Sequence, residues 1–240
     1  MAHSPPLEQS GIGVVAPFDF ALDRELWRWM PDDVSLHITR MAYAPMPATL
    51  EMAVHVSDPA LVAKGYDDVR AVSPLVMAYA CTSGSFIGGL AGEAELVAAM
   101  TDAGAPAAVT TSGALLAALR HLEVGRIATV TPYVAELTVG LTTYLAEAGV
   151  EVVAAAGLGL TSDIWMVPYD VTAALVRDTN TADAQAVFIS CTNLPTFDVI
   201  ATLESELGKP VLTANQVTMW SALHVLGRKA VGPGQQLLER

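Results

Sequence analysis

The chain of 240 residues is poor in positive charge and in charge altogether. Lys and Arg number 12 against 25 Asp and Glu, so the formal net charge is −13, and only 15% of the residues are charged. No basic cluster occurs in the sequence, so we expect neither nucleic acid nor a membrane surface as a partner. An anionic ligand would have to be held by local donors, such as backbone N–H groups at the start of a helix.

Long apolar runs are missing as well, although 52% of the residues are hydrophobic and the mean hydropathy is +0.44. Gly, Pro, Asp or Thr interrupts each run before it reaches the roughly 18 residues that a transmembrane helix needs. The opening residues MAHSPPLEQS lack the charged and apolar regions of a secretory signal. We therefore expect a soluble protein of the cytoplasm.

Cysteine is scarce, since the chain holds only Cys81 and Cys191. A disulfide is disfavoured in a reducing compartment, and two thiols without histidines at ligand spacing do not predict a zinc site. We expect no bound metal. The sequence also lacks a G-x-S-x-G nucleophile elbow, a P-loop and a complete dinucleotide-binding glycine motif.

What the chain does contain is a regular alternation of apolar segments of strand length with longer amphipathic segments. Val- and Ile-rich strands separated by helices are typical of parallel sheets covered on both faces, so the predicted fold class is α/β. The expected strands are residues 11–17, 34–42, 73–80, 126–133, 150–158, 186–190 and 209–214. The expected helices are residues 84–103, 112–122, 133–148, 168–178, 196–207 and 215–227.

Both cysteines stand at the ends of such strands, in LVMAYACTSG (residues 75–84) and AVFISCTNLP (residues 186–195). Each is followed by Thr and then by Ser or Asn, which favour helix N-caps, and ligands bind at this edge of parallel sheets. A helix N-terminus lowers the pKa of a thiol. A free cysteine in an apolar stretch is most often an inert core residue, but the shared placement favours two reactive thiols that face each other.

The repeated strand-Cys-Thr pattern also indicates two halves of the chain. No sharp linker separates them, and the last segment is expected to return to the first half. We predict a first α/β domain from residues 1–108 plus 213–240 and a second from residues 109–212, each about the size of a small domain.

Three segments resemble the aspartate/glutamate racemase superfamily: AYACTSGSF, TTSGALLAALRHLEVGRIATVTPY and FISCTNLPTFDVI. The resemblance is closer to the branch of maleate cis-trans isomerases and arylmalonate decarboxylases, and APFDFALDRELWRW further resembles proteins of bacterial ectoine utilisation. It implies two pseudo-symmetric domains, each a parallel sheet flanked by helices, with the active site in the cleft between them. It also implies that no metal or organic cofactor is needed.

The resemblance assigns roles to particular residues. In maleate isomerases one thiolate adds to the alkene and a second thiol handles protons, which places the nucleophile at Cys81 and its partner at Cys191. In racemases the two thiols act as opposed acid and base, whereas arylmalonate decarboxylases keep only the second thiol. The residues implied to bind the substrate carboxylate are Thr82, Ser83, Tyr133 and Thr192.

One turn departs from the pattern of maleate isomerases, which carry an asparagine after the first strand that grips a carboxylate. Here the turn reads APFDF and ends in Asp19 and Phe20. A carboxylate at this place would repel a dicarboxylate and favour an amine-bearing or partly apolar substrate. Alternatively, Asp19 caps a helix that begins near Leu22.

We therefore predict a cofactor-independent isomerase of a small carboxylate that uses two cysteines. The alternatives are a two-base racemase of an amino-acid-like substrate in ectoine degradation, an arylmalonate decarboxylase-like enzyme, and a ligand-binding relative without catalysis. The expected partner is the small carboxylate, and a homo-oligomer is compatible with the sequence.

Overall fold

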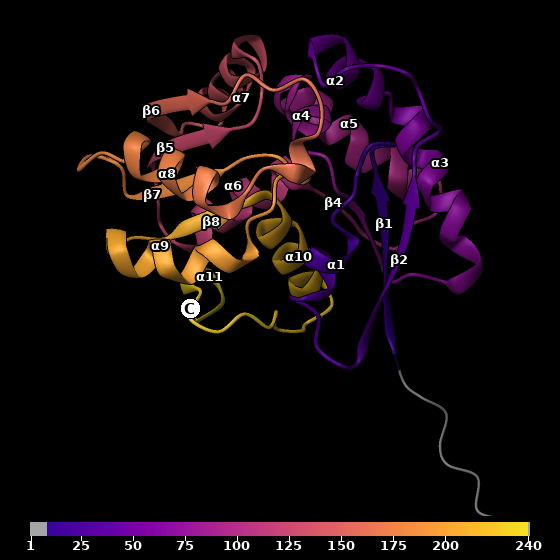
Figure 1. Cartoon of the computed structure of the whole chain (residues 1–240). Helices are drawn as coiled ribbons and strands as arrows, with labels where there is room; N and C mark the ends of the chain where they lie inside the picture. The colour runs from indigo at the N-terminus through magenta and orange to yellow at the C-terminus, as the bar shows by residue number, and fades with distance from the viewer. Residues whose placement is uncertain (1–8, 240) are drawn as a thin grey trace, which may run out of the picture.

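In the computed structural model, which describes residues 9–239, the strands form two four-stranded parallel sheets (Figure 1). The first sheet has the order β2-β1-β3-β4 and the second has the order β6-β5-β7-β8. All the pairings are parallel, and the second order repeats the first with each strand number raised by four. The predicted fold of two α/β halves with the same topology is confirmed.

The elements have the following bounds. The first sheet comprises β1 (Ser10–Ala16), β2 (Val34–Arg40), β3 (Val76–Tyr79) and β4 (Ala108–Thr110), and the second comprises β5 (Arg126–Thr131), β6 (Glu151–Gly157), β7 (Ala186–Ile189) and β8 (Val211–Thr213). The α-helices are α1 (Asp23–Trp27), α2 (Leu50–Val56), α3 (Pro59–Val69), α4 (Thr82–Phe86), α5 (Gly89–Asp102), α6 (Thr111–His121), α7 (Ala135–Glu147), α8 (Tyr169–Thr179), α9 (Ile200–Leu207), α10 (Ala214–Val225) and α11 (Gln236–Glu239). Short 3-10 turns are η1 (Arg70–Val72), η2 (Ile164–Met166) and η3 (Phe197–Val199).

All the strands expected from the sequence are present within a few residues, but several short elements were not predicted. β4 has three residues, too few to show a periodic pattern, and α1, α2 and α3 were also missed. For α3 a signal did exist, because Asp58 caps the helix by accepting from the N–H of Ala60, with Pro59 at the first helical position. The helix expected over residues 84–103 is broken into α4 and α5 at Gly89, whose φ of +66° suits glycine.

The first sheet is covered on both faces, as its apolar strands predict. Alternate residues of β1 and β3, such as Ile12 and Val76, belong to the core beneath α1 and α10. Their neighbours Val15 and Met77 belong to a second core beneath α3 and α5. Burial of each such side chain stabilises the fold by about 1.5–3 kcal/mol. The carboxyl ends of the central strands are thereby held between two packed layers.

Each half contributes a helix to the hydrophobic core of the other half. Helix α6 follows β4 of the first sheet, yet its Leu115 lies in the core of the second sheet. Helix α10 follows β8 of the second sheet, yet its Met219 lies in the core of the first. The two helices meet where the hydroxyls of Thr111 and Thr218 are hydrogen-bonded at 2.8 Å.

The expected domain boundaries fall inside β4, at 108, and inside β8, at 213, and they stay a prediction. Residues 1–8 and residue 240, which were assigned to the first domain, lie outside the described residues. Most of the opening segment MAHSPPLEQS also lies outside the described residues. The cytoplasmic location that was expected from it stays a prediction. Within residues 9–239, no helix combines the length and hydropathy needed to cross a bilayer.

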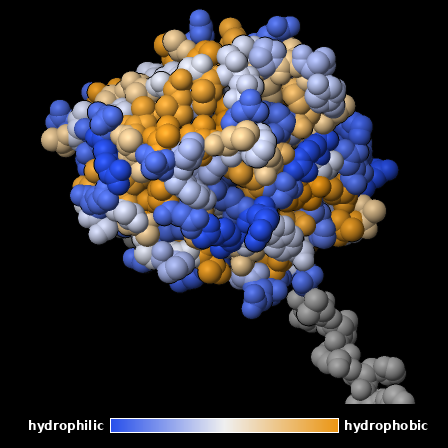
Figure 2. All heavy atoms as spheres, viewed as in Figure 1, coloured by the Kyte–Doolittle hydropathy of each residue, from blue (hydrophilic) through white to orange (hydrophobic). Residues whose placement is uncertain are grey.

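The surface mixes hydrophilic and hydrophobic residues, as Figure 2 shows for the view of Figure 1. Hydrophilic residues gather over the lower centre of this view, and hydrophobic ones gather in the upper part, around α7. On α7, Val139 is 64% exposed. The expectation of a homo-oligomer stays a prediction.

Candidate active site

The two cysteines occupy equivalent places in the two sheets. Cys81 lies two residues after the end of β3, and Cys191 lies two residues after the end of β7, which holds the same position in its sheet. Both side chains are buried, and both line one pocket whose walls come from the two halves. The pocket brings together every residue singled out from the sequence, although their roles stay a prediction: Asp19, Phe20, Cys81, Thr82, Ser83, Tyr133, Cys191 and Thr192.

The pocket is small and carries one charged group. It leaves about 30 Å³ for the centres of water-sized molecules, which suits a ligand of few atoms. Asp19 is the one Asp or Glu in its lining, and no Lys, Arg or His side chain contributes to it among the described residues. A bound carboxylate would therefore be held by hydroxyl and amide groups. Nor do the described residues gather three His, Cys, Asp or Glu side chains that could hold a metal ion.

Cys81 is the N-cap of α4. Its Sγ accepts the N–H of Gly84 at 3.4 Å and lies 3.8 Å from Oγ of Ser83. A side chain at Gly84 would collide with the hydroxyl of Tyr79 and crowd Cys81 Sγ, so glycine is required there. Neither Tyr79 nor Gly84 was singled out from the sequence, because only their packing around the sulfur gives them a role.

The pKa of the Cys81 thiol is raised, not lowered as its place at a helix start predicted. Burial is the largest cause, since it penalises the charged thiolate, and the carboxylate of Asp19 adds to the rise. The N–H of Gly84 and the Ser83 hydroxyl oppose it, whereas Tyr79 donates its hydroxyl proton to the carbonyl of Val56. The expected lowering is wrong because desolvation outweighs a cap on a helix of five residues.

Cys191 lies in a different local structure. Its φ is +86°, a left-handed conformation that costs a non-glycine residue on the order of 1–3 kcal/mol and is found preferentially at functional sites. A turn follows, in which the N–H of Leu194 donates to the carbonyl of Cys191 at 3.2 Å, so the helix start expected there is absent.

Cys191 is also a weak acid. Burial raises the pKa of Cys191 to about 12, the charge of Asp19 adds to the rise, and the N–H of Asn193 and the Tyr133 hydroxyl oppose it. At neutral pH this group is therefore a neutral thiol that can donate a proton.

The hydroxyl groups around the thiols differ in what they can still bind. Thr82 Oγ1 is buried and has no hydrogen-bond partner among the described residues. Tyr133 accepts a hydrogen bond from Ser190 at 3.3 Å, its own hydroxyl acts on the Cys191 sulfur, and burial raises its pKa so far that it stays protonated. Thr192, in contrast, donates to the carbonyl of Ala80 at 3.1 Å. Its side chain is therefore used to hold the site together.

Asp19 faces the pocket and does not cap a helix. Helix α1 begins at Asp23, its N-cap is Leu22, and no side chain caps it. The amide of Asn193 holds the Asp19 loop, since it donates to the carbonyl of Asp19 at 3.0 Å and accepts from the N–H of Ala21 at 2.9 Å. Protein surrounds Asp19 on most sides, and this burial raises its pKa even though one side is open to solvent.

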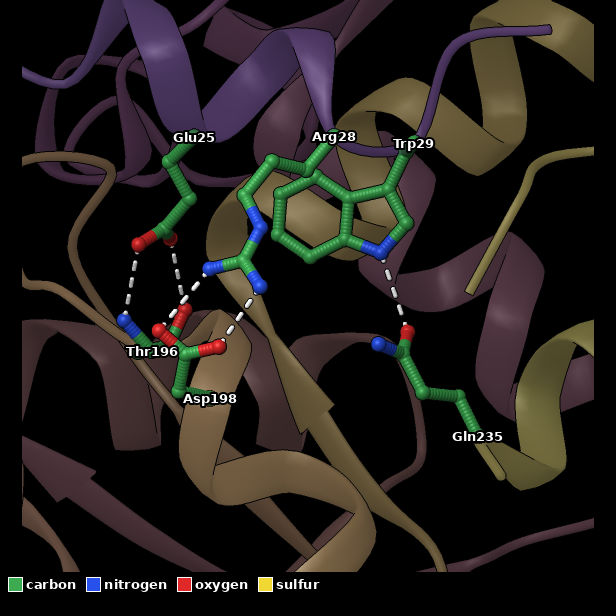
Figure 3. A network of polar contacts seen from close by, with 6 residues as sticks. All are labelled: Glu25, Arg28, Trp29, Thr196, Asp198 and Gln235. Atoms are coloured by element: carbon green, nitrogen blue, oxygen red, sulfur yellow. Dashed lines mark hydrogen bonds and ion pairs between the residues drawn. The ribbon is translucent and has the colours of Figure 1, made fainter. Parts of the chain in front are cut away.

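A buried polar network ties the turn after Cys191 to the first half of the chain (Figure 3). Glu25 of α1 accepts hydrogen bonds from the N–H and the hydroxyl of Thr196, at 3.0 and 2.9 Å, and from the side-chain amide of Asn215, at 3.0 Å. The same Asn215 amide donates to the carbonyl of Thr192 at 2.9 Å. Burial raises the pKa of Glu25. Sequence patterns gave no sign of this role, because a glutamate in a short helix usually faces solvent.

Two further contacts lie on one side of Glu25 in Figure 3. Arg28 forms a two-pronged ion pair with Asp198, at 2.8 and 2.6 Å, and its guanidinium lies 3.6 Å from the ring centre of Phe197. Trp29 donates to the side-chain carbonyl of Gln235 at 2.9 Å. The ion pair thus anchors the 192–198 segment on the first half, beside the buried carboxylate.

Comparison with known proteins extends these observations. Residues 56–238 match the family model described as arylmalonate decarboxylase. Arylmalonate decarboxylase of Bordetella bronchiseptica is 35% identical over 151 residues, which are 61% of this chain and 62% of that protein, so the match spans less than two thirds of that relative. Maleate isomerase of Pseudomonas putida is 31% identical over 185 residues, 76% of this chain and 71% of that protein.

Solved structures agree with the sequence matches. A double variant of arylmalonate decarboxylase in its liganded form, with a glycine changed to cysteine and a cysteine to serine, superposes with a TM-score of 0.88 at 27% identity, over 96% of this chain and 99% of that one. The maleate cis-trans isomerase of Nocardia farcinica gives a TM-score of 0.86 at 25% identity, over 95% and 97% of the two chains.

Proposed function

Because the chain belongs to the arylmalonate decarboxylase family, in the branch that it shares with maleate isomerases, we propose that it is an enzyme that isomerises a small unsaturated carboxylate with Cys81 and Cys191. The resemblance to this branch of the aspartate/glutamate racemase superfamily is thereby confirmed. The relatives are enzymes named for small carboxylates. The reaction and the roles of the residues are the proposal.

One observation carries the proposal: two buried thiols at equivalent strand ends line the same small pocket. A single thiol would suffice for a catalyst that only donates a proton. Two thiols in one pocket allow one to form a bond while the other supplies and removes a proton. The small volume of the pocket limits the reacting part of the substrate to a few atoms.

Cys81 is the better nucleophile of the pair. Burial raises the pKa of Cys191 to about 12, whereas the Cys81 sulfur accepts the N–H of Gly84 and lies 3.8 Å from the Ser83 hydroxyl. The Cys81 thiolate adds to one alkene carbon, and the π electrons move onto the adjacent carbon and its carboxylate. The unpartnered hydroxyl of Thr82, with the hydroxyls of Ser83 and Tyr133 in the same pocket, stabilises the negative charge that develops on the carboxylate oxygens.

The remaining steps return the thiols to their starting state. The neutral thiol of Cys191 protonates the carbon that carries the negative charge, and the former double bond, now single, rotates. The Cys191 thiolate then removes a proton from that carbon, the double bond forms again, and Cys81 leaves as thiolate. No atom is gained or lost, and the product is the trans isomer.

A decarboxylase is the second candidate, because the matching family model carries that name. In that reaction one thiol suffices, since Cys191 would protonate the carbanion left after loss of CO2. Nothing in such a cycle needs a sulfur at Cys81, which lines the pocket as Cys191 does. The presence of both thiols therefore favours the isomerase, while opposed thiols also suit a racemase.

The three reactions are separated by proton NMR in D2O. The probes are maleate, its monoamide, phenylmalonate and L-aspartate, each with the native protein and with Cys81→Ser. The isomerase proposal expects a cis alkene to become trans in the native protein alone. Loss of CO2 from phenylmalonate in both proteins would instead establish a decarboxylase, and deuterium at Cα of aspartate would establish a racemase.

A further inference from the structure

A second cavity adjoins the thiol pocket and shares four lining residues with it: Asp19, Ala48, Ile164 and Asn193. This outer cavity has a volume of about 820 Å³, far larger than the thiol pocket. Its walls are residues 43–48, between β2 and α2, and residues 161–165, which follow β6. The two walls meet where the N–H of Ala48 donates to the carbonyl of Thr161 at 2.8 Å. A substrate that reaches the thiols can therefore extend into a cavity built by both halves.

The outer cavity is acidic. Asp19 and Asp163 line it, and no Lys, Arg or His does so among the described residues. Asp163 accepts a hydrogen bond from Ser162 at 2.9 Å, which fixes its carboxylate without neutralising it. Arg40, which pairs with Ala16 of the neighbouring strand just before the Asp19 turn, is held instead by Asp23 and by the carbonyl of Phe20. The two carboxylates thus have no cationic partner in the cavity.

Aromatic side chains complete the outer cavity. Phe18, Tyr43 and Trp165 line it, and Tyr43 and Trp165 are 80% and 46% exposed. The rings of Phe18 and Tyr43 pack edge to face with centres 5.8 Å apart. Carboxylates combined with aromatic faces form a site for an organic cation, because both attract positive charge.

An acidic, solvated surface is the plain alternative in a protein of net charge −13. An independent observation in the adjoining pocket points to a ligand. Thr82 Oγ1 is buried, lines the thiol pocket and has no partner among the described residues, so it is suited to an acceptor brought by a ligand. A ligand anchored there by a carboxylate passes Asp19 before it enters the outer cavity.

We propose that the outer cavity binds a protonated amine at the far end of the substrate, between Asp19, Asp163 and the aromatic side chains. This inference rests on the proposed function, because it places the carboxylate of the same molecule in the thiol pocket. The substrate is then an amine-bearing unsaturated carboxylate. A second carboxylate in place of the amine would face two acidic groups with no cation to offset them.

Matched probes test the amine site directly. The ω-amino acids from 3-aminopropanoate to 6-aminohexanoate are compared with alkanoates of the same chain length by isothermal titration calorimetry. At the length that spans both cavities, the amino acid is expected to bind at least about 10-fold more tightly, as one charge-assisted hydrogen bond allows. Succinate and glutarate are expected to bind more weakly than the matched amino acids.

Two variants locate the effect, and a third controls for net charge. Asp163→Asn and Asp19→Asn should each reduce the preference for the amino acid several-fold and leave alkanoate binding intact or improved. Asparagine tolerates the left-handed backbone of residue 163, where φ is +53°. Asp102→Asn removes one charge from an exposed site outside both cavities and should leave the preference unchanged.

The outcomes separate the two proposals. If alkanoates bind but no amino acid binds better, or if the preference survives both Asp19→Asn and Asp163→Asn, the amine site is wrong and the proposed function stands. If no alkanoate binds the native protein, the carboxylate pocket is wrong, and the proposed function falls together with the amine site.

Discussion

Thr192, directly after Cys191, donates a hydrogen bond of 3.1 Å to the carbonyl of Ala80, directly before Cys81. This contact joins the two strand-end turns that carry the thiols, although 110 residues separate the two cysteines along the chain. Both partners are buried, so no water replaces the bond. The spacing of the two sulfurs therefore depends on a side chain whose hydroxyl proton is already engaged by the protein.

The first prediction concerns this link. Thr192→Val keeps the shape of the side chain but leaves the carbonyl of Ala80 without its donor, which should lower the free energy of unfolding by about 1–3 kcal/mol. Turnover should fall as well. Thr129→Val is the matched control, because Thr129 Oγ1 is buried without a partner and its loss should be nearly neutral. Urea unfolding of both variants checks the prediction, and equal stabilities would contradict it.

The second prediction concerns the order in which the thiols ionise. Cys191→Ala leaves Cys81 as the sole thiol, and Cys81→Ala leaves Cys191. Because the pKa of Cys191 is raised to about 12, its alkylation by iodoacetamide should remain slow until the pH is far above neutral. Cys81 should react at lower pH, since the N–H of Gly84 and the Ser83 hydroxyl stabilise its thiolate. Rates measured by mass spectrometry over pH 6–11 would refute this order if Cys191 reacted first.

The third prediction concerns Asp19, whose negative charge raises the pKa of both thiols. Asp19→Asn removes that repulsion, so the pKa of each thiol should fall and its alkylation should begin at lower pH. The same single-thiol proteins serve for the measurement, with Asp102→Asn as the control for net charge. If the pH dependence of the alkylation rate is the same with and without Asp19→Asn, the carboxylate does not act on the sulfurs.

The fourth prediction concerns the buried carboxylate of Figure 3. Glu25→Gln cannot accept all three hydrogen bonds that Glu25 accepts, so it should destabilise the fold by about 1–3 kcal/mol. Asp198→Asn, which breaks the exposed pair with Arg28, should cost at most about 1 kcal/mol. If Asp198→Asn lowered the free energy of unfolding as much as Glu25→Gln does, the buried carboxylate would not be the main anchor of the segment, and the prediction would be wrong.

The pH dependence of Glu25→Gln has a definite sign. The pKa of Glu25 in the folded protein is raised above its ordinary value of 4.5, so the folded state holds this proton more tightly than the unfolded chain. The stability that results is present below pH 4.5 and is lost as the pH rises through the raised pKa. The difference in unfolding free energy between native protein and variant should therefore shrink as the pH rises above 4.5, and an increase would contradict the account.

The sequence predicts the alternating strands and the two thiols because both depend on local patterns. Cys81 and Cys191 were found from the strands that precede them, and all eight residues singled out line one pocket. Asn193 and Glu25 were missed, since their roles arise from partners more than 170 residues away in the chain. The direction of the thiol pKa shifts was also missed, because burial is a property of the assembled fold and here outweighs the local cap.

The central claim is that the two thiols act as one unit on one substrate. Turnover of the carboxylate that the native protein isomerises is measured for Cys81→Ser, Cys191→Ser and the double variant. Each single variant should lose a factor of about 10²–10⁴, and the double variant should lose no more than the worse single one, because the second thiol has no role without the first. Near-native turnover by either single variant, or losses that multiply in the double variant, would contradict the claim.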